Sequence, residues 1–257
     1  MLIDTHCHIH ESDYPLDVEE VIARANKVGV KQIICVGVNE SSSRLAIDFA
    51  NSHDDIFAVA GIHPHNATNN FDQIVDILGD AKNANSKLVA IGEIGLDYHY
   101  NFSSQDKQIE ILQKQIELAL KYDLPIVFHV REAFDDFWPV FDNFKFGNNQ
   151  IKGVIHSFTD NKINISKALR RDLYIGLNGF ITFTKDESQK EMFASLPLDK
   201  ILFETDAPFL TPVPLRGKIN EPAFVKNVAE YYSKVCHVDF NKIADMTTSN
   251  ARTLFNL

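Results

Sequence analysis

Histidines and carboxylates that directly follow short apolar runs are the residues of this sequence best suited to chemistry. Imidazole nitrogens and carboxylate oxygens are common protein ligands of divalent metals, and both groups can also transfer protons. Six of them follow five apolar runs, a repetition that separate core or surface residues would not explain. The pattern therefore predicts a metal site. The six residues are His6, His8, Glu93, His129, His156 and Asp206.

The segment Asp4-Thr5-His6-Cys7-His8 places two histidines two positions apart. Side chains two apart on a strand point to the same side, so both imidazoles could bind one metal ion. For this motif taken alone, a pair of unrelated core or surface histidines is the alternative.

Glu93 lies among Ile, Gly and Leu residues, where a carboxylate is costly to bury unless it is paired or binds a cation. An ordinary surface position is therefore a weaker explanation for this residue. His129 and His156 each end an apolar run, and each taken alone could be a hydrogen-bonded core histidine. Glu204 and Asp206 stand two positions apart after a further run.

The apolar runs have the length of strands and alternate with segments of helical periodicity, which is typical of βαβ units and a parallel sheet. We predict a single (β/α)8 barrel, or TIM barrel, over residues 1–257, with extra C-terminal helices. The carboxyl ends of barrel strands share one face, which would bring the six candidate ligands together. The predicted strands are Leu2–Thr5, Gln32–Val36, Ile56–Ala60, Leu88–Ile91, Pro125–Phe128, Gly153–Ile155, Leu173–Gly176 and Lys200–Phe203. The predicted helices are Leu16–Val28, Ser42–Asn51, Phe71–Lys82, Ser104–Tyr122, Glu132–Asn143, Ile163–Arg171, Ser188–Ser195, Glu221–Val235 and Asp239–Phe255.

The composition is that of a globular protein with one large core, since 45% of the residues are hydrophobic and 23% are charged. The three cysteines lie far apart, which predicts neither a disulfide framework nor a thiolate zinc site. The sequence has no signal-peptide pattern at its start and no apolar stretch of membrane-spanning length, so we expect a cytoplasmic protein without membrane contacts. The net charge of −10 does not favour long-range attraction of polyanions, although bound metals would add local positive charge.

An ordered set of motifs resembles the TatD family of metal-dependent hydrolases, within the amidohydrolase-like barrel group. The resemblance covers essentially the whole chain, and the set is specific although each motif alone is weak. Asp160 and the segment Asn178-Gly179-Phe180 depart from the usual pattern, but neither touches a candidate ligand. The matching motifs are Asp4–His8, Gly61–His65, Gly92–Tyr98, Pro125–His129, His156–Thr159, Glu204–Pro208, Arg216–Pro222 and Asn250–Phe255.

The resemblance implies a site for two divalent metal ions. One ion would be held by His6, His8, Glu93 and Asp206, and the second by Glu93, His129 and His156, with Glu93 bridging. Two such ions about 4 Å apart can activate a water molecule and clamp the oxygens of a displacement at phosphorus. On this interpretation Asp206 is also the general base.

Three further residues are candidates for substrate contacts. His63 follows the third apolar run, and we expect it either to contact a phosphate or leaving group or to orient Glu93 or a metal-bound water. Arg216 and Lys218 could contact phosphate, although an ordinary solvated loop explains them equally well. Four aromatic residues could stack on bases or could belong to the core: Phe102, Trp138, Phe180 and Phe183.

The activity that the resemblance implies is that of a magnesium-dependent DNase, a 3′–5′ exonuclease with DNA as substrate and no obligate protein partner. The histidine ligands favour zinc, manganese, nickel or iron instead, because magnesium prefers oxygen ligands. Two alternatives stay open. One is an esterase or deacylase, for example of D-aminoacyl-tRNA, and the other is a metal-binding accessory protein without turnover.

Overall fold

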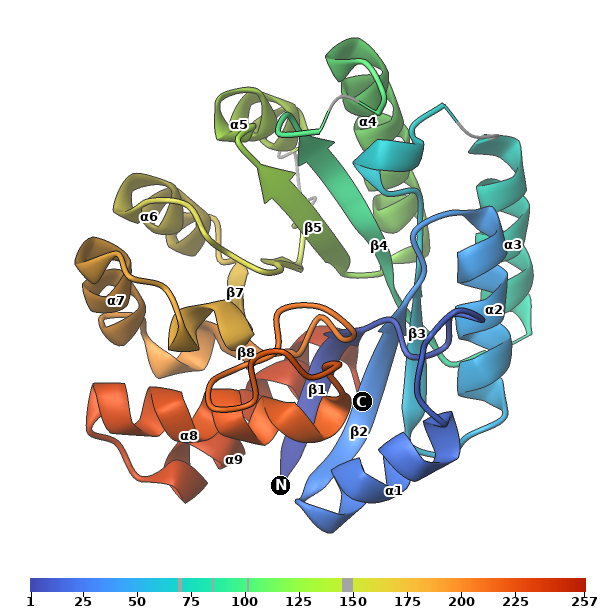
Figure 1. Ribbon diagram of the computed structural model, residues 1–257. Coiled ribbons are helices and arrows are strands. Elements are labelled where there is room, and N and C mark those ends of the chain that lie inside the picture. The colour runs from blue at the N-terminus through green and yellow to red at the C-terminus, as the bar shows by residue number, and fades with distance from the viewer. Residues whose placement is uncertain (69–70, 85, 101, 145–149) are drawn as a thin grey trace. The chain divides into compact units, whose positions relative to one another are not determined.

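Eight parallel strands, each followed by one or more helices, make up the computed structural model of the protein (Figure 1). The structure describes residues 1–68, 71–84, 86–100, 102–144 and 150–257. The strands follow one another in sequence order in one sheet, which is the (β/α)8 arrangement predicted from the sequence. Their bounds are β1 Leu2–Cys7, β2 Val30–Val36, β3 Ile56–Ala60, β4 Leu88–Asp97, β5 Ile126–Arg131, β6 Gly153–Ile155, β7 Tyr174–Leu177 and β8 Ile201–Phe203.

The helices begin and end close to the predicted positions, and several of them start at a side chain that caps the helix. Ser104, for example, accepts a hydrogen bond from the backbone N–H of Lys107 at the start of the fourth helix. Two helices, rather than one, follow the last strand. The helices are α1 Val18–Lys27, α2 Glu40–Asn51, α3 Phe71–Asn83, α4 Gln105–Tyr122, α5 Phe134–Asn143, α6 Lys162–Arg170, α7 Glu187–Ala194, α8 Val225–Cys236 and α9 Phe240–Phe255. Short 3-10 turns are η1 Pro64–Asn66, η2 Gly179–Thr182, η3 Leu198–Lys200 and η4 Pro222–Phe224.

Contacts within the chain divide it into two compact units. The first unit combines the two ends of the sequence, Met1–Cys35 and Ser157–Leu257, and the second is the continuous segment Val36–His156.

In the first unit, β1 pairs in parallel with β2, and β7 pairs in parallel with β8. The first and last strands are joined by a bridge between Cys7 and Ala207 and by a hydrogen bond from the Asp206 amide to the His6 carbonyl, at 2.9 Å. The C-terminal helix α9 packs against β1, and the Thr248 hydroxyl donates to the Met1 carbonyl. The two ends of the chain are therefore interdependent.

In the second unit, β3, β4, β5 and β6 pair successively in parallel. Gly95 of β4 lies opposite His129 of β5, and a Cβ atom at position 95 would overlap the His129 carbonyl oxygen. Its φ of 155° also lies in a region that side chains other than glycine rarely adopt. Glycine at this position therefore allows the two strands to approach closely.

Three strands extend further than the sequence predicted. β1 continues to Cys7, β4 to Asp97 and β5 to Arg131, so His6, Glu93 and His129 lie within strands rather than after them. Each predicted strand end, Thr5, Ile91 or Phe128, directly precedes a histidine or a glycine, and the observed strand continues past it.

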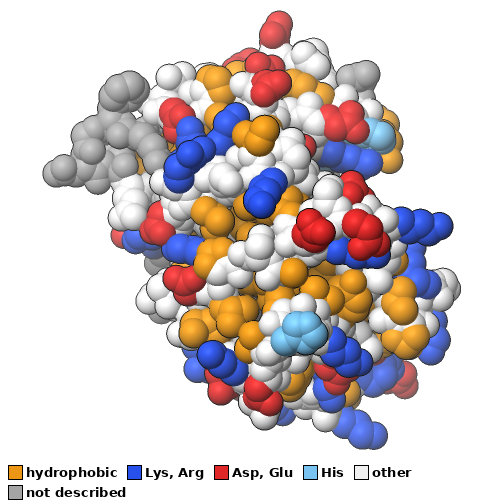
Figure 2. Space-filling model, turned by 90° about the vertical axis from the view of Figure 1, so that its left-hand side faces the viewer, with side chains coloured by type: hydrophobic (Ala, Val, Ile, Leu, Met, Phe, Trp, Pro, Cys, Tyr) orange, Lys and Arg blue, Asp and Glu red, His pale blue; other side chains and the backbone are white. Residues whose placement is uncertain are grey.

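The described helices do not include one that is long and apolar enough to cross a membrane. Figure 2 shows one face of the molecule, on which acidic and basic side chains are interspersed and hydrophobic side chains lie between them. This face does not carry the continuous basic field that often marks a polyanion-binding surface.

Candidate metal-ligand sets

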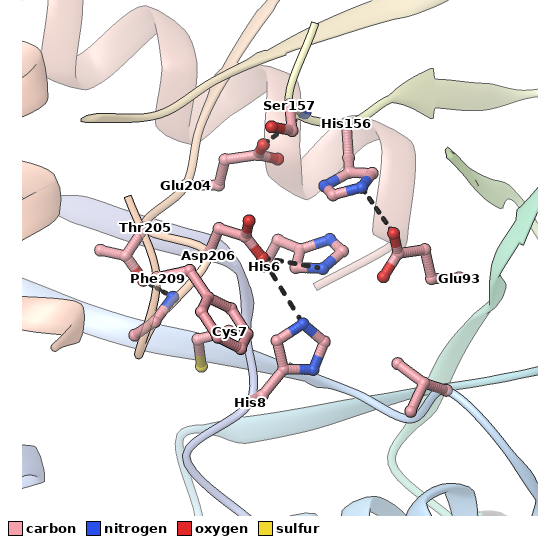
Figure 3. Close-up of polar contacts among 12 residues, drawn as sticks. His6, Cys7, His8, Glu93, His156, Ser157, Glu204, Thr205, Asp206 and Phe209 are labelled. Atoms are coloured by element: carbon pink, nitrogen blue, oxygen red, sulfur yellow. Dashed lines mark hydrogen bonds and ion pairs between the residues drawn. The ribbon is translucent and has the colours of Figure 1, made fainter. Parts of the chain in front are cut away.

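The first unit brings together His6, His8 and Asp206. The Oδ1 atom of Asp206 lies 3.8 Å from Nε2 of His6 and 3.5 Å from Nε2 of His8 (Figure 3). The two rings meet edge to face with centroids 5.1 Å apart. His6 is fully buried, whereas the Asp206 side chain keeps 15% of its surface exposed. The Asp206 carboxylate thus faces both imidazoles.

Asp4 holds Asp206 in place through its neighbour Thr205. The Asp4 carboxylate accepts a hydrogen bond from the Thr205 amide at 2.8 Å and one from the Thr205 hydroxyl at 2.6 Å. Asp206 itself has φ 58°, a left-handed conformation that is uncommon outside glycine. Burial raises the pKa of Asp4 well above its ordinary value, against the opposing effect of these hydrogen bonds. The Asp4–Thr205 pair therefore fixes a strained turn that aims Asp206 at the histidines.

In the second unit, three imidazoles surround one oxygen of Glu93. Its Oε1 atom lies 2.6 Å from Nε2 of His156, 2.7 Å from Nδ1 of His129 and 3.6 Å from Nε2 of His63. Figure 3 shows the Glu93 carboxylate pointing at the His156 ring. Burial alone would raise the pKa of Glu93, but the imidazoles, above all His156, lower it well below its ordinary range. Glu93 is therefore a carboxylate that a cation can bind.

The contacts of His129 indicate whether the ligand set around Glu93 suits a metal ion. Its Nε2 atom lies 3.0 Å from Oδ2 of Asp97, while its Nδ1 atom faces both Glu93 and, at 3.2 Å, Nε2 of His156. Burial opposes protonation, yet hydrogen bonds to Asp97 and Glu93 raise the pKa of His129. A proton on Nδ1 can satisfy the Glu93 carboxylate, and a divalent cation bound between Nδ1, Glu93 and His156 could take the place of that proton. The donors fit a divalent transition metal, with Asp97 as the carboxylate that orients a histidine ligand.

His63 has a defined tautomer. Its Nδ1 atom accepts a hydrogen bond from the backbone N–H of His65 at 3.1 Å, so a neutral ring carries its proton on Nε2, the atom that faces Glu93. Burial lowers the pKa of His63 well below its ordinary value, which keeps the ring neutral. His63 is therefore built to donate a hydrogen bond at Nε2. This arrangement is compatible with both roles expected from the sequence.

The loop after β8 carries Arg216 and Lys218, both of them exposed. The guanidinium of Arg216 lies 3.9 Å from the Phe183 ring centroid and donates to the Thr211 carbonyl at 2.7 Å. Asn220 anchors the loop, because its amide donates to the Thr205 carbonyl at 2.8 Å. The same loop includes Asp206, and Arg216 contacts Thr211 within the loop and Phe183 just after η2.

Three residues that bear on these sets had no role in the sequence analysis: Asp4, His65 and Asp97. The Nε2 atom of His65 lies 3.0 Å from Oδ2 of Asp97, which accepts its hydrogen bond, beside His129. Spacing gives a signal for two of them, because Asp4 precedes His6 by two positions and Asp97 follows Glu93 by four, an even spacing that keeps side chains on one face of a strand. The contact of His65, in the turn η1, with Asp97 at the end of β4 leaves no such signal.

Known proteins resemble this chain over its entire length. The sequence profile of the family described as TatD related DNase matches residues 3–256. A Bacillus subtilis (strain 168) protein named uncharacterized metal-dependent hydrolase YabD is 37% identical over 257 residues, which cover 100% of both chains. The Salmonella typhimurium protein named 3′-5′ ssDNA/RNA exonuclease TatD is 31% identical over 262 residues, covering 100% of this chain and 99% of that one.

A solved structure gives the same result for the fold. The structure of YjjV, a TatD homologue from Escherichia coli K12, matches with a TM-score of 0.91 and 28% sequence identity. The match covers 100% of this chain and 98% of that chain. It confirms the (β/α)8 fold class predicted from the sequence.

Proposed function

The chain belongs to the TatD-related DNase family, and from that membership we propose that it hydrolyses phosphodiester bonds of DNA, releasing nucleotides from the 3′ end. Family membership makes it a metal-dependent hydrolase. The relative named as a 3′-5′ ssDNA/RNA exonuclease is similar to it over the full length. We therefore expect single-stranded DNA as the first substrate to test, and RNA as the second.

The convergence of three imidazoles on Oε1 of Glu93 is the observation that carries this proposal. A carboxylate buried against three histidines is costly to fold without a cation, so the cluster favours a metal site, which the family's hydrolytic chemistry requires. His63, Glu93 and His129 can each offer one ligand atom, and those atoms lie within 4.8 Å of one another. The cluster thus supports metal binding at Glu93.

We propose two divalent ions, assigned as the family resemblance implies. His6, His8, Glu93 and Asp206 would hold one, and Glu93, His129 and His156 the other. The first unit supports the first ion, because the Asp206 carboxylate faces His6 and His8 there. The second unit supports the second ion, because the Glu93 carboxylate faces His129 and His156 there. The histidine ligands favour manganese, zinc, nickel or iron. Magnesium stays a candidate because the family resemblance implies a magnesium-dependent DNase.

Bound divalent ions would supply Lewis acidity and a water of lowered pKa. Around them, Asp206 is suited to accept the proton of the attacking water, because its carboxylate is partly exposed and fixed by the Thr205 turn. His63 is suited to donate its Nε2 proton in a hydrogen bond, to Glu93 or to a phosphate or leaving-group oxygen. Arg216 and Lys218 stay candidates for holding phosphate, from an exposed loop.

The test is a nuclease assay on 3′- and 5′-labelled single-stranded DNA, with magnesium, manganese or zinc supplied in turn. We expect mononucleotides to be released from the 3′ end, no activity in Glu93→Ala, and full activity in Glu117→Ala, which removes an exposed glutamate from α4. Metal analysis of the loaded protein should give two ions per chain.

The outcomes separate the competing functions. Release of a free amino acid from D-aminoacyl-tRNA, with the nucleic acid intact, would identify a deacylase instead. If no metal supports turnover of either substrate while a control nuclease works, the proposal is wrong. Two ions bound without turnover would favour the accessory protein.

We also propose a cytoplasmic location, because Cys7, Cys35 and Cys236 are all free thiols, as is usual in a reducing compartment. Cell fractionation with an antibody against the chain tests this directly. Recovery in the membrane or extracellular fraction would contradict it.

A further inference from the structure

Two aromatic side chains in the second unit are strongly exposed next to the Glu93 ligand set. Tyr100 is 43% exposed and Phe102 is 68% exposed, the largest exposure of any described large hydrophobic residue. Trp138, which the sequence offered as an equal candidate for stacking, is only 4% exposed and packs against Phe134. Exposed rings of this size are costly in water unless they serve an interaction.

The two rings already form a stack. Their centroids are 5.6 Å apart and their planes differ by 21°. The Arg131 guanidinium lies over the Tyr100 ring, 5.1 Å from its centroid, which places a positive charge beside the aromatic surface. Flat π-surfaces combined with a cation are the features that bind bases and backbone of single-stranded nucleic acid without sequence preference.

The stack is tied to the ligand set through His65. The His65 ring meets Tyr100 edge to face at 5.5 Å and Phe102 at 4.9 Å, and its Nε2 atom lies 3.0 Å from Oδ2 of Asp97. The same Asp97 oxygen lies 3.0 Å from His129. One histidine therefore joins the exposed rings to a carboxylate that orients a candidate metal ligand.

The backbone on both sides of the rings is held by side-chain hydrogen bonds. The Asp97 carboxylate accepts from the amides of His99 and Tyr100, at 2.9 and 3.0 Å. The Ser103 hydroxyl donates to the His65 carbonyl at 3.1 Å, and Gln108 donates to the carbonyls of Asp97 and Ser103. Tyr100, Asp97 and Ser103 are thus anchored beside the rings, which lowers the entropy cost of binding a flat ligand.

We propose that Tyr100 and Phe102 form a stacking subsite for a nucleobase of the substrate strand, with Arg131 contacting the adjoining phosphate. This inference rests on the proposed nuclease function and specifies how the substrate is held. The subsite accepts any base, because every base has a π-face. Binding at this position keeps the strand beside the Glu93 set.

The test compares Phe102→Ala and Tyr100→Ala with Phe102→Trp, which keeps a π-face, and with Leu45→Ala, which removes a 40% exposed side chain from α2. On single-stranded DNA we expect the alanine variants to raise KM about 5- to 100-fold with little change in kcat, as loss of one base–aromatic stack does. Phe102→Trp and Leu45→Ala should behave as the wild type. Circular dichroism checks that every variant is folded.

Two further measurements separate stacking from general damage. An oligonucleotide that lacks bases at its three 3′-terminal positions should bind the wild type as weakly as normal DNA binds Phe102→Ala, and the variant should not distinguish the two. A terminal 2-aminopurine should be quenched on binding to the metal-free wild type but not to Phe102→Ala.

The results also distinguish this inference from the proposed function. If the wild type neither binds nor cleaves nucleic acid, the nuclease proposal fails and the subsite with it. If the wild type cleaves DNA and Phe102→Ala does so with unchanged KM and unchanged quenching, only the stacking subsite is overturned.

Discussion

At the scale of single residues, Asp97 is the side chain that most influences the candidate ligands without being one of them. Oxygen Oδ2 lies 3.0 Å from both His65 and His129, while Oδ1 accepts two backbone amides. A carboxylate in this position selects the tautomer of the histidine and raises its basicity as a ligand.

We therefore expect Asp97→Asn to weaken metal binding about 10- to 100-fold, the usual effect of losing such a partner. Competition against a chelating dye measures the affinity. Asp136→Asn is the matched control, because Asp136 is exposed and its carboxylate accepts a hydrogen bond from the Tyr98 hydroxyl at 2.8 Å. Equal affinity in the two variants would show that Asp97 does not orient His129.

Thr205→Val tests the turn that aims Asp206. It removes the hydroxyl that donates to Asp4 at 2.6 Å, leaving a buried carboxylate oxygen poorly satisfied. We expect a loss of about 1–3 kcal/mol in the free energy of unfolding, measured by urea denaturation of the metal-free protein. Thr253→Val, in α9, should cost much less, since the Thr253 hydroxyl donates to the Ser249 carbonyl at an exposed position. Similar losses in both variants would contradict this account.

Six candidate metal ligands could be predicted from the sequence, but not the residues that contact and orient them. His6, His8 and Asp206 converge in the first unit, and Glu93, His129 and His156 converge in the second. Each follows an apolar run, and such runs can be recognised in the sequence alone. The hydrogen bond between His65 and Asp97 depends on how neighbouring strands and turns pack, so no local pattern reveals it.

At the scale of elements, the glycines of β4 explain why this strand was predicted too short and how it approaches β5 so closely. Glycine in a strand pattern usually marks an interruption, so the strand was expected to end at Ile91. The observed strand continues through Gly92 and Gly95 to Asp97. At these positions the small residue permits close contact with β5, which the sequence alone does not specify.

Gly95→Ala should destabilise the protein by more than about 3 kcal/mol, because the added methyl group would meet the His129 carbonyl and force strand β5 away. Gly29→Ala is the control for backbone strain alone. Gly29 also has positive φ, 93°, but nothing lies within 4 Å of its added Cβ, so about 1–2 kcal/mol is expected. Chemical denaturation measures both variants, and equal losses would mean that steric contact with β5 is unimportant.

At the scale of the whole molecule, the two compact units raise the question of how many domains fold. The sequence predicted one domain over residues 1–257, and we keep this as a proposal. The first unit is built from both ends of the chain, with β1 hydrogen-bonded to the segment after β8. Neither end can complete that unit alone, which favours joint folding.

One unfolding transition is the expected outcome. Trp138 is the single tryptophan of the chain and lies in the second unit, so its fluorescence reports on that unit, whereas far-UV circular dichroism reports on the entire chain. The two signals should change at the same denaturant concentration if folding is cooperative. Separate midpoints would indicate two domains.

Metal removal should lower the melting temperature, because a ligand that binds only the folded state stabilises it in proportion to the logarithm of its concentration. We expect the melting temperature to fall on treatment with a chelator and to recover when manganese or zinc is added. Glu93→Ala should show neither response. A wild type that melts at the same temperature with and without chelator would contradict metal binding by the folded chain.

The pairing of His6 with Asp206 has a consequence for protein synthesis. These residues are 200 positions apart, and the amide of Asp206 bonds the carbonyl of His6. A ribosome adds Asp206 to the chain 200 residues after His6. A nascent chain therefore lacks its proposed general base until residue 206 has been added, and premature termination before residue 206 yields a product without it.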